Sequence, residues 1–142
     1  MEVSLYTDGG SRGNPGPGAA GIYIVTPNGK EYVFGFYLGV VTNNQAEYYA
    51  LRLGLEQVKS LSMMMDGAKL LIYMDSELVV KQMRGEYKIK DSGLSLIQRS
   101  IQPLIHEFPM VEFKHIPRED NSVADGAVNS VLDLQDGIKS TT

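Results

Sequence analysis

The sequence contains no cysteine and only two histidines, His106 and His115. Without cysteine the protein has no disulfide, no thiolate zinc site and no cysteine nucleophile. Two histidines are also too few for a histidine-rich metal site. A metal ion bound by this chain must therefore be a hard cation held by oxygen ligands.

Long apolar runs and a targeting segment are missing as well. No run reaches the ~18 residues needed to cross a bilayer. The sequence begins MEVSLYTDGG, which lacks the basic and apolar regions of a signal peptide. We therefore expect a cytoplasmic protein that does not enter a membrane.

The length and composition indicate one globular domain. The 142 residues are 43% hydrophobic and 21% charged, and they contain no internal repeat, linker or low-complexity segment. We place a single domain at 1–136 and a flexible tail at 137–142, and we expect a monomer with no obligate protein partner. The net charge of -4 argues against binding of nucleic acid through phosphate contacts alone. A nucleic-acid substrate would need a metal ion or a local basic cluster.

Hydrophobic periodicity, turn signals and capping residues predict the order β β β α β α α β α. The predicted strands are 3–8, 20–26, 31–38, 70–74 and 111–116, and the predicted helices are 43–61, 77–83 with Ser76 as its cap, 94–108 and 122–134. The glycine- and proline-rich segment 9–17 and the methionines at 63–65 are predicted loops, and Pro103 is expected to kink its helix or mark its effective start. This order implies an α/β fold with a five-stranded mixed sheet, in which an antiparallel meander joins parallel strands, flanked by helices.

One spacing, Gly16-x-Gly18-x-x-Gly21, matches a dinucleotide-binding fingerprint. That fingerprint needs a strand before it and a helix after it, whereas the sequence from Gly21, GIYIVTPNG, continues as a strand and a hairpin. We interpret these glycines as places where the chain passes close to a neighbouring strand.

Four carboxylates occupy related places in the predicted fold. Asp8 and Asp75 each end an apolar strand, where α/β sheets place ligand groups. Glu47 and Asp125 lie near the start of a helix, beside an apolar stripe. Taken singly, each acid has a simpler explanation as a turn, cap or helix-dipole residue. Taken together, the four acids can face one crevice.

Four sequence blocks surround these acids: TDGGSRGNPGPGAAG at 7–21, TNNQAEYYAL at 42–51, MDSELVVKQMRGEYKIK at 74–90 and HIPREDNSVAD at 115–125. In this order and at these separations, the blocks resemble the signature of type 1 ribonuclease H over nearly the whole chain. The resemblance implies a ribonuclease H-like fold and carries the catalytic acids of the family onto Asp8, Glu47, Asp75 and Asp125. All four acids are present, which argues against a binding-only descendant.

The resemblance also implies an endonuclease that cuts the RNA strand of RNA–DNA hybrids and leaves 3′-hydroxyl and 5′-phosphate ends. Four gathered carboxylates repel one another, and two Mg²⁺ ions, or Mn²⁺ in their place, would relieve that repulsion. Two such ions ~4 Å apart can flank a scissile phosphate. One ion would lower the pKa of the attacking water, and the other would neutralise charge on the departing 3′-oxygen.

Compact hydrogen-bonding groups near these acids are candidates for reading the 2′-hydroxyls that distinguish RNA from DNA. These groups belong to Gly10, Ser11, Asn14, Asn43, Asn44 and Gln45. For Asn14 and Gln45, turn and cap chemistry is an equal alternative, since Thr42-Asn43-Asn44-Gln45 has the pattern of a capping box.

Basic and hydroxyl side chains supply candidates for phosphate contacts. Those near the acids are Arg12, Thr42 and Ser76. Lys88 and Lys90 belong to a local basic patch that is a candidate for duplex binding, the alternative being a solvated helix end.

His115 and Arg118 are alternative candidates for a positive group that assists proton transfer or product release. His115 ends a predicted strand, whereas Pro117-Arg118-Glu119-Asp120 is typical of a loop, which slightly favours Arg118.

Two other functions remain open at this point. A non-catalytic module that binds hybrids would have lost at least one of the four carboxylates. A DNA junction or transposition nuclease of the same fold would also use clustered acids, but it would lack the Asp-Gly-Gly-Ser and Thr-Asn-Asn blocks.

Overall fold

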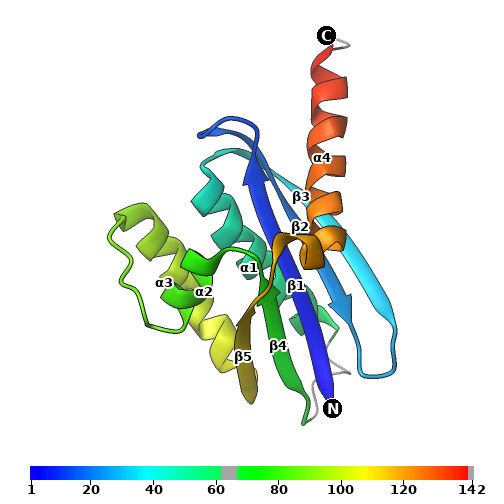
Figure 1. The fold of residues 1–142 in the computed structure, drawn as a ribbon, viewed down its shortest axis with the longest axis vertical. Coiled ribbons are helices and arrows are strands. Elements are labelled where there is room, and N and C mark those ends of the chain that lie inside the picture. Colours follow the sequence, from blue (N-terminus) through cyan, green and yellow to red (C-terminus); the bar gives the residue numbers. More distant parts are fainter. Residues whose placement is uncertain (62–66, 141–142) are drawn as a thin grey trace.

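The computed structural model describes residues 1–61 and 67–140, which form a five-stranded sheet flanked by helices (Figure 1). The strands are β1 (Glu2–Ser11), β2 (Gly16–Val25), β3 (Glu31–Val41), β4 (Lys69–Met74) and β5 (Met110–His115). The helices are α1 (Asn43–Ser60), α2 (Glu77–Met83), α3 (Ser92–His106) and α4 (Ser122–Ser140), and a short 3-10 helix, η2 (Arg118–Asn121), precedes α4. The predicted order of strands and α-helices is confirmed.

The sheet has the strand order β3-β2-β1-β4-β5. β1 pairs antiparallel with β2, and β2 with β3, whereas β1 pairs parallel with β4, and β4 with β5. α1 connects β3 to β4, and α2 and α3 connect β4 to β5. The predicted mixed sheet, with a meander joined to parallel strands by helical crossovers, is therefore confirmed. β1 lies at its centre.

The prediction of a loop over 9–17 is wrong. β1 continues to Ser11 and β2 begins at Gly16, so that Ser11 pairs with Gly18 and only 12–15 remain as a turn. A glycine-rich composition is typical of a turn. The backbone hydrogen bonds between two strands do not depend on side chains, however, and here they continue as far as Ser11 and Gly18. Asp8 therefore lies inside a hydrogen-bonded strand and not at its end.

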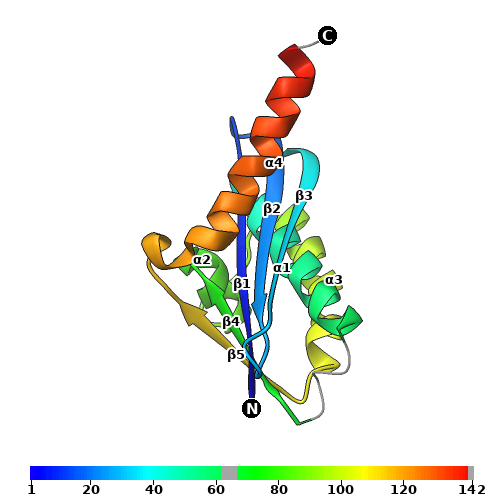
Figure 2. The ribbon, with the colours of Figure 1, turned by 90° about the vertical axis from the view of Figure 1, so that its right-hand side faces the viewer.

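Helices cover both faces of the sheet (Figure 2). α1 and α3 pack together on one face, above the main hydrophobic core. Fully buried members of this core include Leu5, Ile22, Leu51, Leu55 and Ile72. α4 lies on the opposite face, where Val128 and Leu132 pack with Ala19 of β2 in a second, smaller cluster. Each buried leucine or isoleucine stabilises the fold by about 1.5–3 kcal/mol, so the two clusters fix the helices on the sheet.

The close approach of α4 to β2 depends on Gly21. A Cβ atom at this position would lie 1.9 Å from the carbonyl oxygen of Ala124, the residue before Asp125. The spacing Gly16-x-Gly18-x-x-Gly21 lies within β2, and a hairpin and β3 follow it instead of a helix. Gly18 lies close to the neighbouring strands, as interpreted from the sequence, whereas the close neighbour of Gly21 is a helix and not a strand.

Replacing Gly21 with alanine is expected to reduce the free energy of unfolding by about 3 kcal/mol, because the new methyl group would meet backbone that no side-chain rotation can move. Urea denaturation measures this change. Gly126→Ala, in α4, is the matched control: nothing lies within 4 Å of a Cβ atom there, and alanine favours a helix over glycine by about 1 kcal/mol. Equal stability of the two variants would contradict the close approach.

The helix ends differ from prediction mainly in α3 and α4. α3 begins at Ser92, because Asp91 caps it by accepting a hydrogen bond from the N–H of Leu94 at 3.0 Å, so Pro103 does not mark its start. α4 continues to Ser140, past the predicted end at 134. The domain boundary at 136 stays a prediction, and the methionines at 63–65 and the last two residues lie outside the described residues. Within the described ranges, no helix is both long and apolar enough to cross a membrane.

Three tyrosines form a row across the sheet. Tyr6 of β1 pairs in register with Tyr23 of β2 and with Tyr73 of β4. The ring centroid of Tyr6 lies 4.6 Å from that of Tyr73, with 14° between the ring planes, and 5.4 Å from that of Tyr23. Because side chains alternate along a strand, Tyr6 lies on the same face of β1 as Asp8.

Candidate active site

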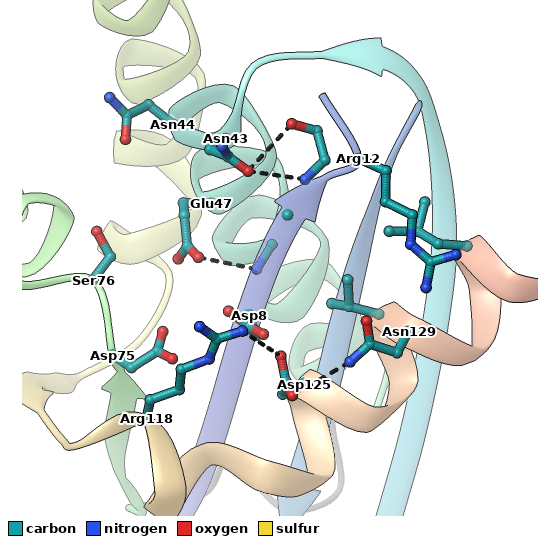
Figure 3. Close-up of a pocket in the computed structure, with 15 residues that line it drawn as sticks. Asp8, Arg12, Asn43, Asn44, Glu47, Asp75, Ser76, Arg118, Asp125 and Asn129 are labelled. Atoms are coloured by element: carbon teal, nitrogen blue, oxygen red, sulfur yellow. Dashed lines mark hydrogen bonds and ion pairs between the residues drawn. The ribbon is translucent and has the colours of Figure 1, made fainter. Parts of the chain in front are cut away.

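Four carboxylates from four elements meet in one cavity of about 530 Å³ (Figure 3). Asp8 comes from within β1, Glu47 from α1, Asp75 from the residue after β4, and Asp125 from the first turn of α4. The structure thus brings together all four acids that the sequence analysis placed at one crevice. Their catalytic role stays a prediction.

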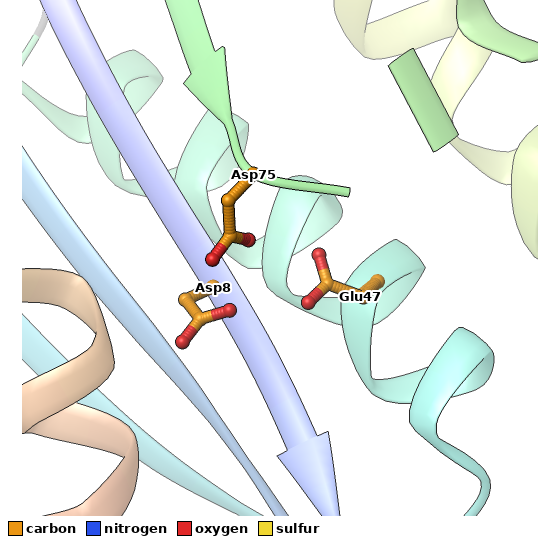
Figure 4. A group of neighbouring side chains, drawn as sticks. All are labelled: Asp8, Glu47 and Asp75. Atoms are coloured by element: carbon orange, nitrogen blue, oxygen red, sulfur yellow. The ribbon is translucent and has the colours of Figure 1, made fainter. Parts of the chain in front are cut away.

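Asp8, Glu47 and Asp75 form a tighter group within this cavity (Figure 4). One carboxylate oxygen of each lies within 4.8 Å of the other two. The backbone N–H of Gly9 donates to Oε1 of Glu47 at 3.2 Å and so fixes this carboxylate. Glycine is needed there, since a Cβ atom at position 9 would lie 2.2 Å from the carbonyl oxygen of Ala46. β1 and α1 therefore approach closely enough to place Asp8 beside Glu47.

Asp125 faces this group from α4 and is close enough to Asp8 to contribute to the raised pKa of that carboxyl. Its Oδ2 accepts a hydrogen bond from Nδ2 of Asn129 at 3.4 Å, and its Oδ1 lies 3.8 Å from the guanidinium of Arg118. The side chain of Arg118 is 80% exposed, so this ion pair is weak and a ligand at the cavity can replace Asp125 as the partner of Arg118.

Burial and mutual repulsion raise the pKa values of two of the acids. The pKa of Asp8 is raised to about 7, first because its carboxylate is buried and then because Asp75 is close. The pKa of Glu47 is raised well above its ordinary value, again first by burial and then by the charge of Asp8. Shifts of this kind, caused by burial together with a specific charged neighbour in a cavity, are typical of functional sites.

The donor set fits a hard divalent cation. Carboxylate oxygens are the ligands that Mg²⁺ and Mn²⁺ prefer. Glu47 is 8% exposed, and its Oε2 has no hydrogen-bond partner among the described residues. A buried carboxylate oxygen without a partner is costly alone and is stabilised beside a cation. Asp8, Glu47 and Asp75 are therefore the residues best placed to bind a metal ion, with Asp125 next to them.

Comparisons with known proteins agree with this geometry. A family model described as reverse transcriptase-like matches residues 6–131. LC11-RNase H1, isolated from compost by a metagenomic approach, is 39% identical in sequence, and its structure superimposes with a TM-score of 0.89 over 94% of this chain and 97% of that one. The chain belongs to the ribonuclease H1 family.

Further ribonuclease H relatives cover most of the chain. Ribonuclease HI of Halobacterium salinarum is 38% identical over 132 residues, which are 92% of this chain and 64% of that protein. A bifunctional protein of Mycobacterium tuberculosis is 35% identical over 94% of this chain, which spans only 36% of that relative's length. LC11-RNase H1 has also been solved in complex with an RNA/DNA hybrid, in a structure with a TM-score of 0.85 and 40% identity to this chain.

Several predicted substrate contacts line the cavity of this ribonuclease H1 family member. They are Gly10, Ser11, Arg12, Asn43, Asn44 and Ser76. Asn14, Thr42 and Gln45 instead line a neighbouring cavity of about 290 Å³, which shares Asn43 and Asn44 with the first.

Thr42 and Gln45 form the predicted capping box at the start of α1. Oγ1 of Thr42 accepts the N–H of Gln45 at 3.1 Å, and Oε1 of Gln45 accepts the N–H of Thr42 at 2.9 Å. Oδ1 of Asn14 accepts the N–H of Asn43 at 3.0 Å and ties the turn at 12–15 to α1. The alternative of turn and cap chemistry is thus confirmed for Asn14 and Gln45, and a role of either in substrate binding stays a prediction.

Lys88, Lys90 and His115 lie outside the acidic cavity. The two lysines are exposed on the segment between α2 and α3, where they line a separate cavity of about 520 Å³. His115 is the exposed last residue of β5. Of the two alternative positive groups, Arg118 lines the acidic cavity and His115 does not.

Two asparagines at the site were not predicted from the sequence. Asn129 stands four residues after Asp125 and hydrogen-bonds to it, a helical spacing that was visible in the sequence. Asn121 is buried in η2, and its Nδ2 donates to the carbonyl oxygen of Thr7, next to Asp8, at 2.9 Å. No local signal indicates that second contact, because it joins residues that are far apart in the sequence.

Proposed function

We propose that the protein hydrolyses the RNA strand of RNA–DNA hybrids, leaving 3′-hydroxyl and 5′-phosphate ends, with two Mg²⁺ or Mn²⁺ ions held by Asp8, Glu47, Asp75 and Asp125. The observation that carries this proposal is the group of three carboxylates whose oxygens lie within 4.8 Å of one another. Membership of the ribonuclease H1 family and the hybrid bound to LC11-RNase H1 support the choice of substrate.

The groups of the chain itself prepare this site for a phosphodiester. Bound Mg²⁺ would supply activation of the attacking water and neutralisation of charge on the departing oxygen. The backbone of Asp8 belongs to a paired strand and the carboxylate of Glu47 is fixed by the Gly9 amide, so the two acids are positioned before a ligand arrives. Because the pKa of Asp8 is about 7, this carboxyl is partly protonated near neutrality, and binding of a cation would release its proton.

Polar groups at the start of α1 suit recognition of the RNA sugar. Oδ1 of Asn43 accepts the N–H of Ser11 at 3.0 Å, while the hydroxyl of Ser11 donates to the carbonyl oxygen of Gly13 at 2.6 Å. The first contact fixes which side of the Asn43 amide is the acceptor, and the NH₂ group of Asn43 is then a donor of defined direction at the cavity wall. A donor at this place suits a 2′-hydroxyl, the group that distinguishes RNA from DNA.

The test is cleavage of end-labelled RNA–DNA hybrid, duplex DNA and duplex RNA of one sequence, with Mg²⁺ and with EDTA. We expect cleavage of the RNA strand of the hybrid only when the metal ion is present, with products that carry 3′-hydroxyl and 5′-phosphate ends. Binding of the hybrid without cleavage would indicate a binding module. Preferred cleavage of duplex DNA would indicate a DNA nuclease of the same fold, and either result would overturn the proposal.

Replacing Arg118 with alanine is expected to lower kcat about tenfold, because its cationic group lies at the cavity beside Asp125. Arg118→Lys should restore part of the rate, since lysine keeps the charge but not the planar geometry. His115→Ala is the matched control and should change kcat less than about twofold, because His115 does not line the cavity. A larger loss from His115→Ala than from Arg118→Ala would reverse the assignment.

Reversing the charges of Lys88 and Lys90 to glutamate is expected to weaken hybrid binding while leaving kcat at saturation nearly unchanged. The slope of log Kd against log salt should fall by about two, since each lost phosphate contact removes about one. Lys30→Glu/Lys59→Glu, which alters two other lysines, one before β3 and one in α1, is the control for net charge. An unchanged slope in the Lys88/Lys90 variant would identify this segment as a solvated surface.

A further inference from the structure

Arg12 ties the turn between β1 and β2 to the second half of α4. Its side chain lines the acidic cavity and extends toward α4 (Figure 3). One terminal nitrogen of the guanidinium lies 2.6 Å from Oδ1 of Asp133, and the other lies 2.5 Å from Oδ2 of Asp136. Because the two aspartates are three residues apart on a helix, they present their carboxylates side by side to one guanidinium.

α4 also supplies the acidic partner of the other arginine at this cavity. Among the described residues that line the cavity, Arg12 and Arg118 carry the positive charges, and Arg118 faces Asp125 at 3.8 Å. Both groups that could meet a phosphate are therefore paired with carboxylates of a single helix. A phosphate that enters the cavity has to compete with α4 for them.

The electrostatics of the Arg12 contact oppose a third anion. One guanidinium between two carboxylates leaves a local charge of −1, so a phosphate is repelled as long as both carboxylates stay in place. The contact is nevertheless easily exchanged, since 38% of the Arg12 side chain, 71% of that of Asp133 and 55% of that of Asp136 are exposed to solvent that screens the pair. A guanidinium binds phosphate and carboxylate with the same planar geometry, so one anion can replace the other without rebuilding the site.

We propose that Asp133 and Asp136 are an internal competitor for Arg12, which a backbone phosphate of the nucleic acid must displace before it binds. The acidic side of α4 would then weaken the binding of substrate and speed the release of product. This inference rests on the proposed function, because it takes the competing phosphate to belong to an RNA–DNA hybrid.

The first test is a double-mutant cycle on the binding of a fluorescent RNA–DNA hybrid, measured in EDTA so that the RNA strand is not cut. Asp133→Asn/Asp136→Asn is expected to lower Kd about fivefold when Arg12 is present, and to change it less than about twofold in an Arg12→Ala background. Glu56→Gln/Glu107→Gln is the matched control: it removes two carboxylates that also pair with cations, but on α1 and just after α3. An equal decrease in Kd in the Arg12→Ala background, or no decrease in either background, would overturn the proposal.

The second test separates this inference from the proposed function. Its probe is inorganic tripolyphosphate, and its signal is the NMR resonance of the Arg12 guanidinium. Competition predicts that this resonance shifts at about fivefold lower tripolyphosphate concentration in Asp133→Asn/Asp136→Asn than in the unaltered protein. If the resonance shifts in this way but the RNA–DNA hybrid is not cleaved in the presence of Mg²⁺, the proposed function alone is refuted. Equal titration of the two proteins would refute the internal competition.

Discussion

Replacing Asp8 with asparagine is expected to lower the rate of hybrid cleavage by about a thousandfold or more while leaving the fold intact. Asp8 contributes an oxygen to the close group with Glu47 and Asp75. An amide has the shape of a carboxylate but lacks its charge, so the variant should keep its packing and lose its affinity for a divalent cation. Single-turnover cleavage at saturating Mg²⁺ measures the effect.

Two further variants are compared with Asp8→Asn. Asp75→Asn removes the neighbouring charge and should behave like Asp8→Asn. Asp120→Asn removes a charge from an exposed position in η2 that does not line the cavity, and it should keep the rate within about twofold. Retention of more than about a tenth of the activity by both Asp8→Asn and Asp75→Asn would refute a cation site built on these acids.

In the absence of metal ions, the protein is expected to become less stable as the pH rises from about 4 to about 7. The pKa of Asp8 is about 7 in the folded protein, because of burial and the nearby Asp75, whereas it is about 4 in the unfolded chain. Between these values the folded state binds more protons than the unfolded state, so each increase in pH favours unfolding. Asp8 therefore contributes its full stabilisation at a pH below its unfolded pKa and none at a pH above its folded pKa. The free energy of unfolding differs by about 4 kcal/mol between these two limits.

Thermal unfolding in EDTA at pH 5 and at pH 8 measures this dependence. The Tm of the unaltered protein should fall by about 5 to 10 °C more than that of Asp8→Asn, which has no proton to lose at this position. Adding Mg²⁺ at pH 8 should restore the Tm of the unaltered protein but not that of the variant. Parallel pH profiles for the two proteins would show that Asp8 is not the group responsible.

Local sequence patterns were sufficient for most of the fold. The apolar run at 70–74 predicted β4 because a strand buried on both faces has no polar positions, and β4 begins only one residue earlier. The capping box at Thr42 predicted the start of α1 because its hydrogen bonds are local. The extent of β1 and β2 escaped prediction, since the ladder between Ser11 and Gly18 depends on pairing of whole strands and not on the residues themselves.

The site shows the same difference between features with a local sequence pattern and contacts between distant parts of the chain. The four acids were identified from their places at the ends of predicted elements and from the blocks around them, and the cavity contains them all. Contacts that join distant parts of the chain carry no local signal. The position of Arg12 in a turn does not indicate that it pairs with Asp133 and Asp136. The sequence around Asn121 likewise does not indicate its contact with Thr7. Only the packing of α4 and η2 against β1 and β2 brings these groups together.

The row of tyrosines supplies the protein with an optical reporter. The sequence contains no tryptophan, so tyrosine dominates its absorption in the near ultraviolet. Tyr6 and Tyr73, whose rings are 4.6 Å apart and nearly parallel, each stand two residues before an acid of the cavity, Asp8 and Asp75. The circular dichroism of such a ring pair depends on the angle between its planes. A cation that draws the two acids together would therefore change the spectrum of the unlabelled protein, so that occupancy of the site is read in the absence of any nucleic acid.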